Sequence, residues 1–234
     1  VGIPGTGMIG LPIAVALGAI IGKSEYQLEV LKDSTPEAVK LGKQYINEKR
    51  VCISLKEGIV EKLYIEVLCE AEGKVATAII AGGHTTFIYI ARGEEILFSK
   101  QPVGTEEQDE ENLDLNLKKV YDFALTAPLE EIRFILETAR LNKAAAESSF
   151  QGDYGHALGK VLRGRYEHQI MGDSVFSHIL SYTSAACDAR MAGAMIPVMS
   201  NSGSGNQGIS ATLPVLIFAE ENGKSEEELI RALM

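Results

Sequence analysis

The stretch Leu63-Tyr64-Ile65-Glu66-Val67 decides the fold class, because its apolar residues alternate with Tyr and Glu. A period of two is typical of a half-buried β-strand. Three further segments have a strand-like pattern, with Gly-containing turn signals between them: residues 51–55, 75–81 and 96–98. We therefore expect four or five short antiparallel strands between residues 50 and 103.

On either side of this region the pattern is helical. Residues 8–31 have an apolar, helical pattern, within which the run 8–21 should form a core helix. Ser34-Thr35-Pro36-Glu37 opens a helix over 35–49 with a cap, an early proline and an acid in the first turn. After residue 115 the apolar residues recur with a helical period, over segments 115–125, 129–150, 155–166, 173–195, 207–222 and 225–234. The sequence thus predicts an α+β protein, in which a small antiparallel sheet with a packed helix is joined to a mainly helical domain.

These patterns divide the chain into four parts. We expect residues 1–33 to pack as a helical segment with the C-terminal helical part, and 34–104 to form a small α+β subdomain. Residues 105–114 are rich in Asp and Glu, which predicts a solvated acidic loop. Residues 115–234 form the helical domain, truncated at its end. Because the chain starts inside a patterned segment and stops within an amphipathic helix, we expect it to be an internal fragment of a longer protein.

Composition excludes several classes of protein. Hydrophobic residues make up 46% of the 234 residues, which is enough for a core. The net charge of −10 argues against a nucleic-acid partner, since such binding needs clustered Lys and Arg. The longest apolar run, residues 8–21, contains Pro12 and is shorter than the roughly 20 residues of a membrane span, so we expect no membrane partner. A homo-oligomer is left open.

The three cysteines, Cys52, Cys69 and Cys187, are widely separated and odd in number. They form no C-x-x-C pair, so the spacing supports neither a disulfide framework nor a zinc site, and the site prediction contains no metal ligand. Cys52 and Cys69 lie in strand-like segments, where a free Cys is usually a small buried hydrophobe. This usage of cysteine fits a reducing cytoplasm best.

The first candidate site is the Gly-rich run over residues 200–210, which lies ahead of a predicted helix. Glycines let successive N–H groups turn toward one point, short polar side chains add donors, and the helix contributes its positive end. The expected guest is a carboxylate or a phosphate. The candidate binding residues are Ser200, Asn201, Ser202, Gly203, Ser204, Gly205, Asn206 and Gln207. The alternative is an exposed connector, but the run lies between two apolar segments, which favours an ordered loop.

The pattern G-x-G-x-x-G occurs twice, at Gly5, Gly7 and Gly10 and at Gly203, Gly205 and Gly208. It raises the alternative of a nucleotide-dependent oxidoreductase. A true dinucleotide fingerprint needs a β-strand that feeds the turn, and neither copy follows a convincing strand pattern. We interpret both as chance matches.

The second candidate site is His84-Thr85, which follows Gly82-Gly83 at a break between strands. His84 could transfer protons near neutral pH and is the candidate catalytic residue, with Thr85 as a candidate substrate ligand; an ordinary loop histidine is the alternative. Arg190 lies two residues from Asp188, so the two face different sides of a helix. The simplest role of Arg190 is to form an ion pair, and the alternative role is to bind the carboxylate of the substrate. His156, His168 and His178 show no partner pattern.

Four stretches of the chain resemble a known family: residues 4–12, 28–33, 82–85 and 183–207, the last reading TSAACDARMAGAMIPVMSNSGSGNQ. The family is that of the iron–sulfur-dependent L-serine dehydratase alpha chain and L-cysteine desulfidase, and the likeness is strongest to its desulfidase-like branch. The resemblance implies β-elimination from a small L-amino acid substrate, with cysteine favoured over serine and serine left open, which yields pyruvate, ammonia and sulfide or water. A non-enzymatic amino-acid or anion-binding module is the alternative.

The resemblance also implies a [4Fe–4S] cluster held by three cysteines in the full-length protein. In that family the cluster cysteines lie in a Cys-Thr-Glu-Pro segment upstream and in segments downstream of the Asn-Gln-Gly motif, and this chain contains neither region. Cys187 is therefore given no metal role. We expect the fragment alone to bind no cluster and to be inactive. No lysine stands in a pyridoxal phosphate context, so that cofactor is not supported.

Overall fold

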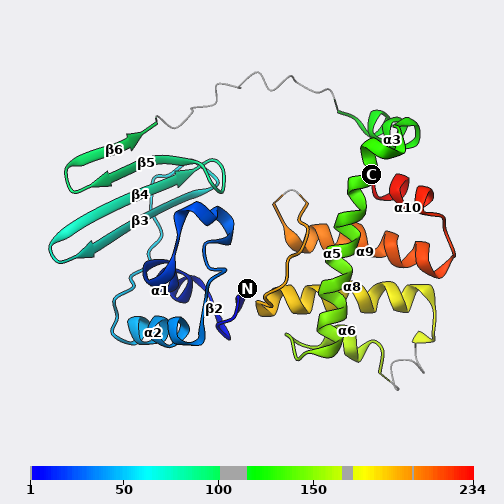
Figure 1. Cartoon of the computed structure of the whole chain (residues 1–234), viewed down its shortest axis with the longest axis horizontal. Helices are drawn as coiled ribbons and strands as arrows, with labels where there is room; N and C mark the ends of the chain where they lie inside the picture. The colour runs from blue at the N-terminus through cyan, green and yellow to red at the C-terminus, as the bar shows by residue number, and fades with distance from the viewer. Residues whose placement is uncertain (1, 101–114, 165–170, 202) are drawn as a thin grey trace.

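The computed structural model describes residues 2–100, 115–164, 171–201 and 203–234. Figure 1 shows one half that carries the sheet and the first helices, and a second half built from helices. The predicted α+β class, with a small antiparallel sheet and a mainly helical part, is confirmed. The expected acidic loop, residues 105–114, lies outside the described residues.

The N-terminal segment is more divided than its apolar composition suggests. It contains a hairpin of β1 (Gly2–Ile3) and β2 (Met8–Ile9), the helix α1 (Leu11–Ile21) and the 3₁₀ turns of η1 (Ser24–Glu29). The core helix expected over residues 8–21 forms as α1, whereas the remainder of the helical segment expected over 8–31 contains only the 3₁₀ turns of η1. Gly10, with φ 89°, precedes α1, and Gly22 ends it with an N–H bond to the Gly18 carbonyl.

The helix α2 (Pro36–Asn47) begins at the predicted cap, because the Thr35 hydroxyl accepts the Ala38 N–H at 3.2 Å. It packs against α1, and together they bury Ile13, Leu17 and Ala38. The described contact between this N-terminal segment and the helical half runs through β1, which touches α8 (Val175–Ala192).

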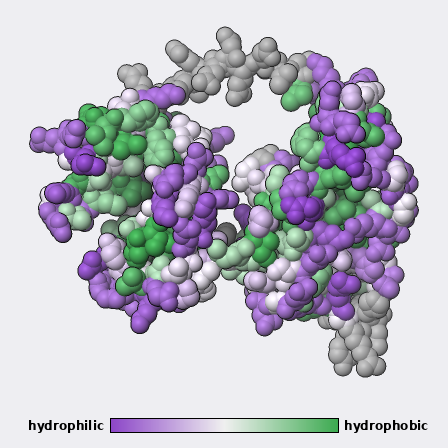
Figure 2. All heavy atoms as spheres, in the orientation of Figure 1, coloured by the Kyte–Doolittle hydropathy of each residue, from purple (hydrophilic) through white to green (hydrophobic). Residues whose placement is uncertain are grey.

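The main sheet has four antiparallel strands in sequence order: β3 (Tyr64–Ala71), β4 (Lys74–Ala81), β5 (Phe87–Arg92) and β6 (Glu95–Ser99). The register pairs Val67 with Ala78, Ala78 with Ile90, and Ile90 with Phe98, so these residues share one apolar face. Figure 2 shows hydrophobic residues gathered over this sheet.

The predicted strand over residues 51–55 is absent, since residues 51–60 form no strand. Leu55 is 92% exposed, so its alternating pattern has no buried face against which to pack. Both described sheets are antiparallel, so the parallel sheet of a dinucleotide-binding fold is not found among the described residues.

The second half is helical, as expected. Its elements are α3 (Leu117–Thr126), α4 (Leu129–Ile132), η2 (Arg133–Ile135), α5 (Leu136–Gln151), α6 (Leu158–Val161), α8, α9 (Gly205–Glu221) and α10 (Glu226–Leu233). Side-chain caps mark the starts of α3, α8, α9 and α10. The predicted helix over 129–150 is thus interrupted at η2, and only α6 forms in the described part of 155–166. The capping box of Ser225 and Glu228 opens α10 as its sequence predicts.

The core of this half lies where α5, α8 and α9 pack together (Figure 1). Alanines supply much of it, including Ala145, Ala146, Ala185 and Ala186, which are all fully buried. Small side chains let helices approach closely, and larger residues such as Ile209 and Leu213 of α9 fill the remaining space. This packing fixes the two ends of the candidate Gly-rich loop. None of the described helices is both long and apolar enough to cross a membrane.

Candidate functional site

The Gly-rich run forms a tight turn followed directly by α9. The Asn201 N–H donates to the Ser204 carbonyl at 3.1 Å, and the Ser204 N–H donates back to Asn201 at 2.9 Å. Gly203 has φ 75°, a backbone conformation that favours glycine. The Ser204 side chain then caps the helix, since its hydroxyl accepts the Gln207 N–H at 3.3 Å. Hydrogen bonds within the run therefore hold its described residues together, while Ser202, one of the candidate binding residues, lies outside the described residues.

Two backbone donors remain at the start of α9. The N–H groups of Gly205 and Asn206 have no acceptor among the described residues, whereas those of Asn201, Ser204 and Gln207 are used inside the loop. Unbonded N–H groups in the first turn of a 17-residue helix carry its positive partial charge. The sequence predicted donors along the whole run, and at the start of α9 the N–H groups of Gly205 and Asn206 have no acceptor among the residues that the structure describes.

Arg190, near the C-terminal end of α8, lies against this helix start. A Cβ atom on Gly205 would overlap the Arg190 Nε and lie 2.9 Å from its Cδ, so only glycine leaves room for the side chain. Arg190 Nη1 donates to Asn206 Oδ1 at 3.0 Å. With its oxygen bonded to Arg190, the Asn206 amide is left with its N–H groups as donors.

The ion pair that the sequence suggested for Arg190 is not formed with any described residue. The nearby acid, Asp188, instead accepts the Gly159 N–H at 3.2 Å. Arg190 therefore brings a positive charge to the beginning of α9 that no described carboxylate neutralises. A guanidinium beside a helix N-terminus is a favourable place for a carboxylate.

His84 joins this loop from the other half of the molecule. It is exposed in the turn between β4 and β5, where Gly82 has φ 78°. A Cβ atom on Gly203 would lie 3.6 Å from His84 Nε2. The two candidate sites, which are far apart in the sequence, thus become neighbours. Thr85 is also exposed in this turn.

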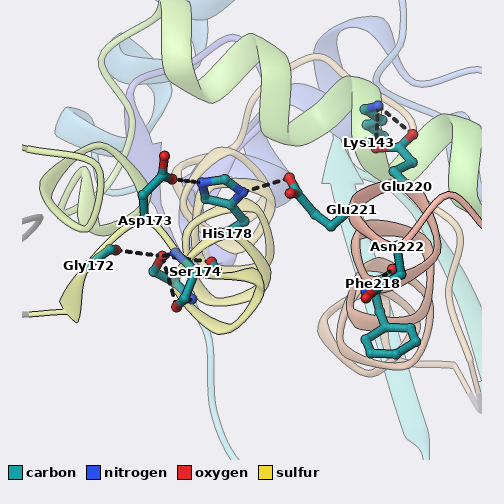
Figure 3. A network of polar contacts seen from close by, with 10 residues as sticks. Lys143, Gly172, Asp173, Ser174, His178, Phe218, Glu220, Glu221 and Asn222 are labelled. Atoms are coloured by element: carbon teal, nitrogen blue, oxygen red, sulfur yellow. Dashed lines mark hydrogen bonds and ion pairs between the residues drawn. The ribbon is translucent and has the colours of Figure 1, made fainter.

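His178 is a polar site that the sequence analysis missed. Its Nε2 lies 2.5 Å from Asp173 Oδ1 and its Nδ1 lies 2.6 Å from Glu221 Oε1, which ties α8 to the end of α9 (Figure 3). The bond to Glu221 raises the pKa of His178 above its usual 6.5, burial opposes this, and Asp173 adds to it. Because both ring nitrogens are engaged, we interpret His178 as a structural tie. Glu221 lies 43 residues from His178 in the sequence, so no local pattern reveals that partner.

The cysteines do not converge on one point. Cys52 and Cys69 are exposed, so the expectation that they are buried hydrophobes was wrong: the strand predicted around Cys52 does not form, and Cys69 lies on an outer strand of the sheet. Cys187 packs against the helical core, and its burial raises the pKa of the thiol. No group of three metal-ligating side chains exists among the described residues. The three cysteines therefore do not fit a [4Fe–4S] cluster, which needs three thiolates that converge on one cluster.

Comparison with known proteins places the chain in a family. The family model described as serine dehydratase alpha chain matches residues 25–234. The chain belongs to the serine dehydratase alpha chain family. The family resemblance expected from residues 183–207 is thereby confirmed.

The relatives are UPF0597 proteins of bacteria. One from Bacteroides fragilis is 82% identical over 234 residues, which cover all of this chain and 55% of the relative. One from Bacteroides thetaiotaomicron is 77% identical, and the match covers 100% of this chain and 54% of the relative. One from Vibrio parahaemolyticus is 42% identical, and the match covers 99% of this chain and 55% of the relative. The chain therefore spans about half the length of the curated relatives it matches. No solved structure matches it.

Proposed function

We propose that the full-length protein is a lyase that performs β-elimination on a small L-amino acid, L-cysteine or L-serine, and that this chain supplies the carboxylate site and the proton-transfer residue. The family assignment supports a lyase of the serine dehydratase type. The observation that carries the proposal is the meeting of His84 with the Arg190-bonded loop at Gly203.

The substrate carboxylate would bind at the start of α9. It would accept hydrogen bonds from the N–H groups of Gly205 and Asn206, which have no acceptor among the described residues, from the Asn206 amide and from the Arg190 guanidinium. Hydrogen bonds of this kind, between ionised partners and aligned helix donors, are the strong ones. With the carboxylate held there, the Cα–H bond of the substrate would lie on the side of the loop that His84 faces.

His84 would act as the base for the Cα proton. The electron pair of the Cα–H bond forms the Cα=Cβ bond, and the Cβ–S or Cβ–O bond breaks to release sulfide or, after protonation, water. The aminoacrylate product takes a proton at Cβ to give an imine, which water hydrolyses to pyruvate and ammonia. A histidine is suited to such a transfer near neutral pH.

A [4Fe–4S] cluster remains a proposal for the full-length protein only. When bound, such a cluster would act as a Lewis acid on the leaving group. Its ligands would have to come from outside the described residues, because the three cysteines of this chain do not meet. No step above depends on it.

Pyruvate release by the full-length protein from L-cysteine and L-serine tests the proposal. We expect His84→Asn to lower kcat by about 10²-fold or more, the usual range for a lost general base. Asn206→Ala should raise KM, since a lost charge-assisted hydrogen bond costs about 1–3 kcal/mol. His156→Asn, another exposed histidine, is the matched control. Binding of either amino acid without pyruvate formation would instead support the binding module.

A further inference from the structure

Asn142 of α5 is a fully buried polar residue outside the proposed site, with an exposed fraction of 0%. Its Oδ1 accepts the Met199 N–H at 2.9 Å, and its Nδ2 lies 3.4 Å from the Met199 carbonyl. The same Nδ2 donates to Thr212 Oγ1 at 2.8 Å. One side-chain amide thus binds the residue just before the Gly-rich loop and a residue in the helix just after it.

The Thr212 hydroxyl extends this link to the loop itself. It donates to the Gly208 carbonyl at 2.9 Å, within the first turns of α9. Gly208 is pressed against Met199, since a Cβ atom there would overlap the Met199 carbonyl oxygen. Both ends of the loop are therefore joined through Asn142.

An amide is the side chain that this position requires. The Met199 N–H needs an acceptor and Thr212 Oγ1 needs a donor, because its own hydrogen is directed to Gly208. An apolar side chain of equal size would leave a buried backbone N–H without a partner, which is costly. A carboxylate would place an unpaired charge in the core.

We propose that Asn142 is a positioning residue, which holds the 200–208 loop in the conformation that receives the carboxylate. This inference rests on the proposed function of the loop as a carboxylate site. Asn142 touches no substrate in this arrangement. It acts through Met199 and Thr212, by fixing where the turn at Gly203 and the N–H groups of the first turn of α9 lie.

The test compares three variants of the full-length protein. Asn142→Leu removes every bond of the amide, and Thr212→Val removes only the link to α9. Ser181→Ala is the matched control, because Ser181 is equally buried and loses a 2.8 Å bond to the Gly159 carbonyl of α6, away from the loop. Hydrogen exchange of peptides covering residues 199–208 and the kinetic constants for L-cysteine and L-serine are measured for each.

We expect Asn142→Leu to speed exchange in residues 199–208 and to raise KM by ~10-fold, the equivalent of one lost hydrogen bond, with a smaller effect on kcat. Thr212→Val should also speed exchange in residues 199–208 and raise KM, to a lesser degree. If Asn142→Leu fails to fold, the result for Thr212→Val alone tests the inference. The control should leave the loop's exchange and KM unchanged. Loop exchange or KM that changes no more in Asn142→Leu and Thr212→Val than in Ser181→Ala would overturn the inference.

Failure of the proposed function gives a different result. If the wild-type protein neither binds nor converts L-cysteine or L-serine, the carboxylate site is wrong whatever the variants do. Hydrogen exchange of the unliganded protein reports separately whether Asn142 holds the loop.

Discussion

Gly205→Ala tests the role of Arg190 with the smallest change the chain allows. The added methyl group would overlap Arg190 Nε and lie 3.0 Å from Cζ, while the glycine itself lies in helical backbone that alanine adopts readily. The Arg190 side chain must therefore move away, and its 3.0 Å bond to Asn206 is lost. The substitution changes the position of a charge without removing it.

Two effects on folding stability oppose each other. Loss of a hydrogen bond from a charged donor costs about 1.5–3 kcal/mol, and alanine in place of glycine in a helix contributes up to about 1 kcal/mol. We expect a net loss of about 0.5–3 kcal/mol in the free energy of unfolding. The affinity for substrate loses a charged donor without compensation, which corresponds to a roughly 10–150-fold increase in Kd.

Thermal unfolding and titration calorimetry with L-serine on the full-length protein measure the two quantities. Gly18→Ala is the matched control, because Gly18 lies within α1 and a Cβ atom there meets nothing within 4 Å. It should raise stability slightly and leave the affinity unchanged. An unaltered affinity in Gly205→Ala, with the Arg190–Asn206 bond broken, would refute the role of Arg190 in carboxylate binding.

Three other outcomes are expected. His178 contributes stability that is complete below its usual pKa of 6.5 and is lost as the pH rises through its raised folded pKa, so His178→Gln should flatten the fall in Tm over that window; an unchanged slope would contradict the tie to Glu221 and Asp173. Cys52 and Cys69 should react rapidly with a thiol reagent and Cys187 slowly, because it is packed in the core and its thiol pKa is raised; three equal rates would be inconsistent with that packing. Gly208→Ala should lower stability by about 1–3 kcal/mol, since its Cβ meets the backbone of Met199, and a neutral effect in calorimetry would argue against the close contact.

Local patterns in the sequence predicted the local structure well. The alternation at residues 63–67 indicates β3, and the caps at Thr35 and Ser225 mark the starts of α2 and α10. The same rule failed at residues 51–55, because alternation produces a strand only where a neighbouring strand and a core face are available. Whether they are available is decided by the tertiary fold.

In the candidate site, too, the sequence predicted the local chemistry but not the contacts between distant segments. The donors of residues 200–207 and the histidine in the 82–85 turn could be named from their chemistry, but their meeting at Gly203 could not. Contacts between distant segments leave no periodic signal in a single sequence. Arg190 was expected in an ion pair, and its choice of Asn206 follows from the space that Gly205 leaves beside α8.

Histidine NMR of the full-length protein tests the shared site most directly. With His Cε1 labelled and the His84 resonance assigned from His84→Asn, L-cysteine and L-serine are titrated in turn. Because His84 Nε2 lies beside the loop at Gly203, its resonance should shift and saturate with the substrate affinity, while that of the exposed His156 stays in place. A His84 resonance that does not move while either amino acid binds would show that His84 and the 200–208 loop do not form one site.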